Sequence, residues 1–259
     1  MNLRYLEEGK GKTIVLLHGF CENKEIWNYQ INKLKQTYQV VAIDLPGFGD
    51  NEPLQGEWTI EKMAVAIDQL LDELAIIDYV VIGHSLGGYV GLAMAELFPE
   101  RLRGLGLFHS TALLDSEERK LNRDKTIQFI QKHGVTLFSK SFVTPLFCKI
   151  NRVKYADELE QIKEVVANTS LESMVKTIQA MKNRLDRTHV LKQASFPVLF
   201  IIGKQDQALP MDSLLSQCYL PKESHISFLE DTGHMGMIEQ KEKTTQVLVN
   251  FMEYTSVSI

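Results

Sequence analysis

Short apolar runs of strand type alternate with helical patterns along the first 108 residues of the chain. Thr13–Leu17, Gln39–Ile43 and Asp78–Ile82 are brief and rich in Val, Ile and Leu, whereas Ile60–Ala75 repeats apolar residues at helical spacing. Alternating strands and helices predict βαβ units, whose strands run parallel in one sheet covered by helices. The pattern therefore predicts an α/β fold.

The same alternation continues at both ends of the chain and after residue 197. The further strands that we expect are Arg4–Glu7, Arg103–Phe108, Pro197–Ile202 and Ile226–Leu229. The further helices of this part are Ile26–Lys35, Ser85–Phe98 and Glu239–Tyr254, and Thr59 is the expected N-cap of the helix that starts at Ile60.

Strand signals stop between Thr111 and Ala194. This stretch predicts helices at Ser116–His133, Tyr155–Asn168 and Leu171–Arg184. It carries 15 Lys and Arg against 10 Asp and Glu, a net of +5 in a chain whose net charge is −5. We therefore expect a core domain made of residues 1–110 and 195–259, interrupted by a basic helical insertion at 111–194.

Composition excludes several classes of protein. A net charge of −5 argues against nucleic-acid binding, which needs a basic surface. Glutamates precede the first short apolar run, Ile14–Leu17, so neither a signal peptide nor membrane insertion is expected. Cys21, Cys148 and Cys218 have neither disulfide nor metal spacing and are expected to be free packed thiols. A cytoplasmic location is the simplest expectation.

Gly83-His84-Ser85-Leu86-Gly87 matches the pattern G-x-S-x-G at the point where a predicted strand becomes a helix. The glycines allow a turn too tight for side chains, and this turn would lift the hydroxyl of Ser85 clear of the backbone. The helix N-terminus also favours developing negative charge. Ser85 is therefore a candidate nucleophile, and the alternative is a turn with no chemical role.

A serine reacts only when a base removes its proton, and that base needs a carboxylate to orient it. His234 follows a predicted strand and is the candidate base; Asp206 follows another strand and is the candidate acid. The resulting order Ser85, Asp206, His234 is typical of one enzyme class. Asp115 could supply the carboxylate instead, and Asp231 is more simply explained as an exposed turn residue.

An oxyanion hole requires two N–H donors near the reacting carbonyl. The N–H of Leu86, directly after the nucleophile, is one candidate. The N–H of Phe20, in the loop after Thr13–Leu17, is the other. Gly19 would let that loop turn back over the site, and His18 would brace it.

Five segments together resemble successive signatures of the α/β-hydrolase superfamily, in its cap-bearing single-chain branch. They are LLHGF, DLPGFGDNE, VIGHSLGGYVGLAMAELFPERL, LFIIGKQDQALP and DTGHMGMIEQ. The resemblance implies an eight-stranded, mostly parallel sheet flanked by helices, with residues 111–194 as a helical cap over the site. It also assigns nucleophile, acid and base to Ser85, Asp206 and His234. Asn51 departs from the family pattern, which has serine there, and Asp44 is expected to brace the same loop.

We call the turn at residues 83–87 the elbow. Serine at the elbow favours acyl transfer to water, because dehalogenases and epoxide hydrolases of this superfamily have aspartate there. The resemblance is strongest to carboxylesterases and enol-lactonases, which implies hydrolysis of an ester, thioester or lactone through an acyl-enzyme. Two alternatives stay open: a cofactor-free C–C bond hydrolase or lyase with the same triad, and a non-catalytic receptor on this fold. No metal or organic cofactor is expected.

The expected partner is a small-molecule acyl substrate. If the basic residues of the insertion contact it, this substrate is anionic or carrier-bound; the alternative is that these residues form a solvated helix face. The basic residues concerned are Arg119, Lys120, Arg123 and Lys125. Further candidate substrate-binding residues are His18, Gly19, His84, Phe108, His109 and Ser110. An apolar acyl pocket would be lined by Phe20, Phe108, Phe129, Phe138 and Phe142; packing in the core is the alternative role for these residues.

Overall fold

The computed structural model describes residues 2–257 and contains one seven-stranded sheet. Its strand order is β1-β3-β2-β4-β5-β6-β7, and every neighbouring pair is parallel except β1 with β3. The strands are β1 (Tyr5–Glu8), β2 (Thr13–Leu17), β3 (Gln39–Ile43), β4 (Tyr79–His84), β5 (Leu102–Phe108), β6 (Val198–Gly203) and β7 (Ser224–Leu229). The predicted α/β fold is confirmed.

The expected number of eight strands is wrong for residues 2–257, where the sheet has seven. The eighth strand rested on the family resemblance alone. Each of the seven apolar runs identified in the sequence forms a strand, with ends shifted by at most two residues. Strands β2, β4 and β6 are buried at every position, which explains why their sequences are continuously apolar rather than alternating.

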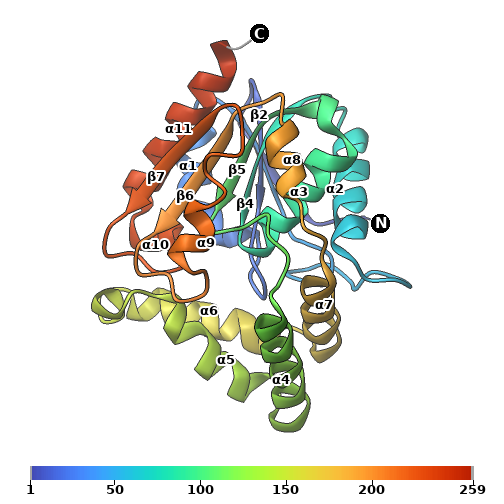
Figure 1. Cartoon of the computed structure of the whole chain (residues 1–259), viewed down its shortest axis with the longest axis vertical. Coiled ribbons are helices and arrows are strands. Elements are labelled where there is room, and N and C mark those ends of the chain that lie inside the picture. The colour runs from blue at the N-terminus through green and yellow to red at the C-terminus, as the bar shows by residue number, and fades with distance from the viewer. Residues whose placement is uncertain (1, 258–259) are drawn as a thin grey trace.

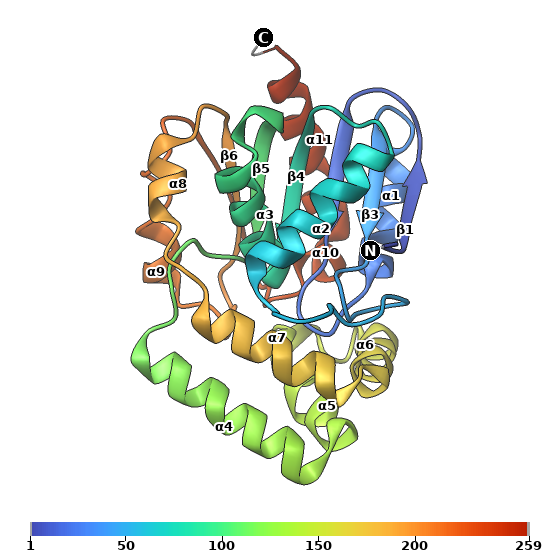
Figure 2. The same ribbon diagram turned by 90° about the vertical axis from the view of Figure 1, so that its right-hand side faces the viewer.

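Helices cover both faces of the sheet. Figures 1 and 2 show α1 and α11 on one face and α2, α3 and α8 on the other. The helices of the core are α1 (Asn28–Leu34), α2 (Ile60–Glu73), α3 (Leu86–Leu97), α8 (Thr188–Gln193), α9 (Met211–Leu215), α10 (Gly236–Glu239) and α11 (Lys241–Val257), with 3-10 turns η1 (Lys24–Trp27) and η2 (Pro99–Arg101). Within residues 2–257, none of the helices combines the length and apolar character needed to cross a bilayer.

Five helices lie between β5 and β6 in the chain. The last of them, α8, falls within the expected insertion 111–194 but lies beside α3 on the sheet (Figures 1 and 2), so we call the other four the insertion helices. They are α4 (Glu117–His133), α5 (Val135–Val143), α6 (Ala156–Asn168) and α7 (Leu171–Asn183), with the 3-10 turns η3 (Thr144–Leu146) and η4 (Lys149–Asn151) after α5. Both views place them together at one end of the sheet (Figures 1 and 2). Helix α5 was not expected from the sequence. Gly134, at a φ of 81°, separates it from α4.

A buried arginine fastens the chain where it returns from the insertion to the core. The Arg187 side chain is almost fully buried and pairs with Glu61 on α2 and with Glu96 on α3, the latter at 2.9 Å. Its backbone N–H donates to the carbonyl of Ala112, 2.8 Å away, at the other end of the insertion. The two connections of the insertion therefore meet and are held against the same pair of helices.

The predicted N-cap of α2 is confirmed, because the Thr59 hydroxyl accepts the Lys62 N–H at 3.2 Å. We expect Thr59→Ala to lower the free energy of unfolding by about 1 kcal/mol, since one N–H at the helix end loses its acceptor. For a chain of this size that is a fall in Tm of about 2–4 °C. Thr59→Ser keeps the hydroxyl and should melt close to wild type; equal losses in both variants would contradict the capping role.

Candidate active site

Ser85 lies on a strained turn between β4 and α3. Its backbone has φ 49° and ψ −110°, a conformation that costs a non-glycine residue about 1–3 kcal/mol and is frequent at functional sites. A Cβ added at Gly83 would lie 2.2 Å from the carbonyl carbon of Gly87, and one at Gly87 would lie 2.5 Å from the Leu17 oxygen. The steric reason for both glycines is thereby confirmed.

Two hydrogen bonds with the end of β5 and the residues after it fix the backbone of this turn. The N–H of Ser85 donates to the carbonyl of Phe108 at 3.0 Å, and the hydroxyl of Ser110 donates to the carbonyl of Ser85 at 2.7 Å. Phe108 and Ser110 are buried. They therefore fix the position of Ser85 through its backbone and leave its own hydroxyl free to face the cavity.

His234 and Asp206 meet at the ends of neighbouring strands β7 and β6. The Nδ1–H of His234 donates to Oδ2 of Asp206 at 2.7 Å, and the other oxygen of Asp206 accepts the N–H of Ala208 at 2.8 Å. The carbonyl of Leu146, in η3, accepts the backbone N–H of His234 at 2.6 Å. With Nδ1 committed to the carboxylate, Nε2 is the nitrogen available to accept a proton.

Burial and the ion pair act on this couple in opposite directions. Burial opposes ionisation of Asp206, but the His234 charge and hydrogen bond lower the pKa of Asp206 to about 2. Burial also opposes ionisation of His234 and so lowers its pKa, but the charge of Asp206 and the hydrogen bond to it raise the pKa of His234 above the ordinary value of 6.5. The geometry thus stabilises a positive charge on His234.

The alternative carboxylates lie elsewhere. Asp115 is held by arginines of the insertion, Arg123 at 2.5 Å and Arg184 at 2.7 Å, so the idea that it orients His234 is not supported. Asp231 is exposed, as expected, in a turn with φ 44°, and its carbonyl accepts a hydrogen bond from Asn151.

A buried glutamate that sequence reasoning missed connects three parts of the site. Oε2 of Glu22 accepts the N–H of Gly19 at 2.6 Å and lies 2.9 Å from Nδ1 of His84. Nε2 of His84 donates to the backbone carbonyl of His234, 2.9 Å away. Burial raises the pKa of Glu22, but the charge and hydrogen bond of His84, the charge of His18 and the hydrogen bond from Gly19 together leave it below its usual value. Each ring nitrogen of His84 thus lies within hydrogen-bond distance of an oxygen, Oε2 of Glu22 on one side and the His234 carbonyl on the other.

The two backbone donors expected for an oxyanion remain available. In residues 2–257 neither the N–H of Phe20 nor that of Leu86 has a hydrogen-bond acceptor in the protein. Glu22 holds the loop that carries Phe20 through its bond to Gly19. Leu86 follows Ser85 at the N-terminus of α3, where the helix dipole favours negative charge.

A cavity of about 230 Å³ brings these elements together. Its walls are formed by Phe20, Glu22, Ser85, Tyr89, Arg119, Arg123, Phe142, Leu146, Met181, Ala208, Leu209 and His234. Ser85 and His234 therefore face one cavity, and residues of α4, α5, η3 and α7 close it from the insertion side. Of the aromatic residues expected in an acyl pocket, Phe20 and Phe142 line this cavity. Phe138 stacks on Phe142 with the ring centres 4.9 Å apart.

Six residues expected to contact substrate do not line this cavity: His18, Gly19, His84, Phe108, His109 and Ser110. Gly19 takes part through its backbone N–H and carbonyl, and the side chains of the other five are buried next to these loops. Nδ1–H of His18 donates to the Gly19 carbonyl at 2.8 Å, and its Nε2 accepts the N–H of Leu45 at 2.9 Å. Burial lowers the pKa of His18 and keeps it neutral, as these two bonds require. The bracing role expected for His18 thus agrees with its position.

His109, Asp206 and His234 offer three possible metal ligands within 4.8 Å of one another. Burial lowers the pKa of His109 well below 6.5, so its Nδ1 is a neutral acceptor, bonded by the N–H of Gly203 at 3.2 Å. Its approach to Asp206 at 3.6 Å is therefore not an ion pair. Because Asp206 is already hydrogen-bonded to His234, hydrogen bonding explains why these three side chains lie close together.

Known proteins resemble the chain along most of its length. A relative from Cupriavidus necator, the dihydrolipoyllysine-residue acetyltransferase component of an acetoin cleaving system, is 25% identical over 93% of this chain, which spans 63% of that protein. A 2-hydroxy-6-oxo-6-(2'-aminophenyl)hexa-2,4-dienoic acid hydrolase from Metapseudomonas resinovorans is 25% identical over 96% of this chain and 87% of its own.

A solved structure of a thermophilic esterase from Thermogutta terrifontis, bound to malate, superimposes with a TM-score of 0.92. It is 28% identical and covers 98% of this chain and 93% of its own. The model of the alpha/beta hydrolase fold family matches residues 12–241, which include the elbow, Asp206 and His234. The chain therefore belongs to the α/β-hydrolase fold family.

Proposed function

We propose that this protein hydrolyses a carboxylic ester or a related acyl bond, a thioester or lactone, with Ser85 as nucleophile. One observation carries the proposal: Ser85, on its strained turn, faces the same cavity as His234, whose Nδ1 is held by Asp206 at 2.7 Å. Nucleophile, base and orienting acid are the three groups that acyl transfer by a serine requires.

The reaction runs in two halves. Nε2 of His234 takes the proton of Ser85 as the serine oxygen attacks the acyl carbon, and the N–H groups of Phe20 and Leu86 bind the oxyanion. His234 then protonates the leaving alcohol or thiol, and the bond to it breaks. Water, deprotonated by His234, attacks the acyl-enzyme, and Ser85 regains its proton. Ester and water thus give an acid and an alcohol.

The comparisons support an ester substrate more than the alternatives. The neighbour from Thermogutta terrifontis is an esterase. Hydrolysis of a C–C bond is the second candidate, suggested by the hydrolase of a hydroxy-oxo-dienoic acid. That reaction would call for added polar groups in the pocket; His109 and Ser110, the candidates for this role, do not line the cavity, whereas Glu22, Arg119 and Arg123 do. A receptor without activity would not need Ser85, His234 and Asp206 together in this arrangement.

Removing the nucleophile tests the proposal. We expect Ser85→Ala to lower kcat for 4-nitrophenyl esters by at least about 10⁴-fold, because no other hydroxyl replaces it at the elbow. Rates should be measured against acyl length from C2 to C12, with fluorophosphonate labelling followed by mass spectrometry. Ser141→Ala, at an exposed position of α5, is the matched control and should keep full activity and labelling. Wild-type turnover in Ser85→Ala would overturn the mechanism.

The pH dependence tests the base. His234 must be neutral to accept a proton, so kcat/KM should fall as pH drops through its raised pKa, giving an acid limb above pH 6.5. Asp206→Asn removes the charge that raises this pKa. The limb should therefore move to lower pH while the maximal rate falls by about 10²–10⁴-fold. Asp231→Asn, an exposed residue nearby, is the control; an unmoved limb in Asp206→Asn would contradict the assignment.

Glu22 is expected to act as a positioning residue. Glu22→Gln keeps the size of the side chain but removes the charge that pairs with His84, so the Phe20 loop is held less firmly. We expect kcat to fall about 10- to 100-fold with a smaller change in KM, because a donor to the oxyanion is misplaced. The charge of Glu22 also raises the pKa of His234, so the acid limb should shift to lower pH.

The matched control is Glu25→Gln, three residues further along the chain in η1 and exposed. It should leave both kcat and the pH profile unchanged. If Glu22→Gln also behaved like wild type in both measurements, the loop would not depend on this buried pair.

A further inference from the structure

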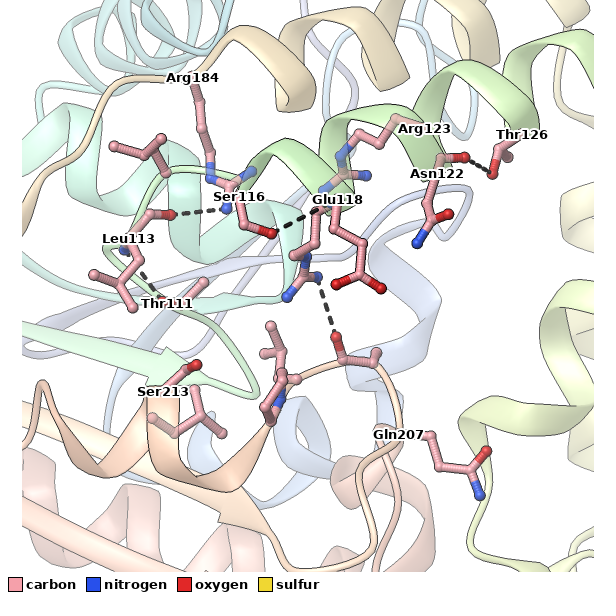
Figure 3. A pocket seen from close by; sticks show the side chains of 16 residues that line it. Thr111, Leu113, Ser116, Glu118, Asn122, Arg123, Thr126, Arg184, Gln207 and Ser213 are labelled. Carbon is pink, nitrogen blue, oxygen red and sulfur yellow. Dashed lines mark hydrogen bonds between the residues drawn. The ribbon is translucent and has the colours of Figure 1, made fainter.

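Two arginines of α4 face the site from the insertion side. Arg119 and Arg123, one helical turn apart, line the cavity that holds Ser85 and His234. The same two side chains also line a second, larger cavity of about 610 Å³ (Figure 3), together with Ala208 and Leu209. The two cavities therefore adjoin at a wall that carries two guanidinium groups.

The other two basic residues of this helix point elsewhere. Lys120 pairs with Glu117 at 2.8 Å along the helix surface, and Lys125 is exposed. Neither lines one of the two cavities. Of the four charges seen in the sequence, two thus form the solvated face and two, Arg119 and Arg123, face the site.

Positive charge is in excess at this wall. Arg119, Arg123 and Arg184 surround a single buried carboxylate, Asp115, at 3.5, 2.5 and 2.7 Å. Glu118 adds one exposed carboxylate to the larger cavity, where Figure 3 shows it beside Arg123. One net positive charge remains after both carboxylates are counted. In the smaller cavity the carboxylate of Glu22 is already committed to His84.

Donors also remain free on both side chains. Arg119 donates to the carbonyl of Ala208 at 3.1 Å, and Arg123 donates to Asp115 and to the sulfur of Met181. A guanidinium has five N–H donors. Within residues 2–257, Nη1 of Arg119 and Nη2 of Arg123 have no hydrogen-bond acceptor in the protein. Planar donor groups of this kind suit a carboxylate, which accepts two bonds at once.

We propose that the substrate carries a carboxylate remote from its scissile carbonyl, and that Arg119 and Arg123 bind this carboxylate at the wall between the two cavities. The inference rests on the proposed acyl-bond hydrolysis and names the class of substrate. The reacting carbonyl lies in the smaller cavity beside Ser85, and the anion lies against α4. The positive charge of Arg119 also reaches His234 and opposes the rise in its pKa, so the arginine lies near the reacting groups.

Two matched pairs of substrates test the proposal and locate the carboxylate. On the acyl side, mono-4-nitrophenyl suberate is compared with its neutral methyl ester. On the alcohol side, 4-carboxyphenyl butyrate is compared with its methyl ester. We expect kcat/KM to favour the anionic member of one pair by about 10- to 100-fold, as charge-assisted hydrogen bonds to a carboxylate allow.

Arg119→Gln should reduce this preference about 10-fold, and Arg119→Gln/Arg123→Gln should bring the ratio close to one. Arg119 is the safer single change, because Arg123 also holds Asp115 at 2.5 Å. Lys120→Gln/Lys125→Gln removes two positive charges from the other face of α4 and should keep the wild-type ratio. Thermal melts of all variants check that they are folded.

Equal turnover of anionic and neutral members of both pairs by the wild type would overturn the inference and leave the proposed hydrolysis intact. So would an equal loss of preference in the lysine and arginine double variants, because general attraction of anions would then be the cause. If no ester is hydrolysed, binding of suberate to Ser85→Ala by calorimetry still tests the anion site. Binding weakened about 10-fold by Arg119→Gln supports it, and no binding overturns it.

Discussion

The site depends on one buried contact, the pairing of His84 with Glu22. It joins the loop after β2, the elbow after β4 and the loop after β7, because His84 also donates to the carbonyl of His234. Parallel strands bring their carboxyl ends to one edge, but that places loops only to within several ångströms. A bifunctional side chain at the centre, with an acceptor at each ring nitrogen, fixes their relative positions more closely.

The buried carboxylates near the site differ in their hydrogen-bonding and charged partners. Asp206 accepts hydrogen bonds from His234 and from the N–H of Ala208, and its charge stabilises His234 when that ring takes up a proton. Glu22 pairs with His84, whose second nitrogen bonds backbone, so this charge stays in place. Asp115 lies among arginines that outnumber it, and the surplus faces the cavity. In the proposed reaction, catalysis, loop positioning and substrate choice would thus use three separate electrostatic arrangements.

The fold could be predicted from the sequence because the central strands β2, β3, β4, β5 and β6 are buried along most or all of their length. Such strands must be short and apolar, and the signal of Gln39–Ile43 or Thr13–Leu17 needs no tertiary information. The elbow could also be predicted from the sequence, since steric crowding at Gly83 and Gly87 admits no other residue. The eighth strand failed because no apolar run supported it.

The support of the site could not be predicted in the same way. Glu22 and Glu25 lie three residues apart in one polar stretch of the sequence, and the residue types around them do not indicate which of the two is buried. His109 has a φ of 47°, which turns its side chain into the protein behind the elbow. Orientations of this kind depend on backbone conformations that residue type does not specify. The residues expected to contact substrate because they lie close to Ser85 therefore include several, such as His109 and Ser110, that do not line the cavity.

Substrate choice is the least constrained by the fold, because the core supplies the same reacting groups to many chemistries. The helical phase of α4 separates its charges: positions four apart, Arg119 and Arg123, share one face, and Lys120 does not. A change of one residue in that phase would turn the arginines to solvent and leave Ser85, His234 and Asp206 untouched. Changes along α4 could therefore alter the proposed substrate preference while Ser85, Asp206 and His234 keep their positions beyond the ends of β4, β6 and β7.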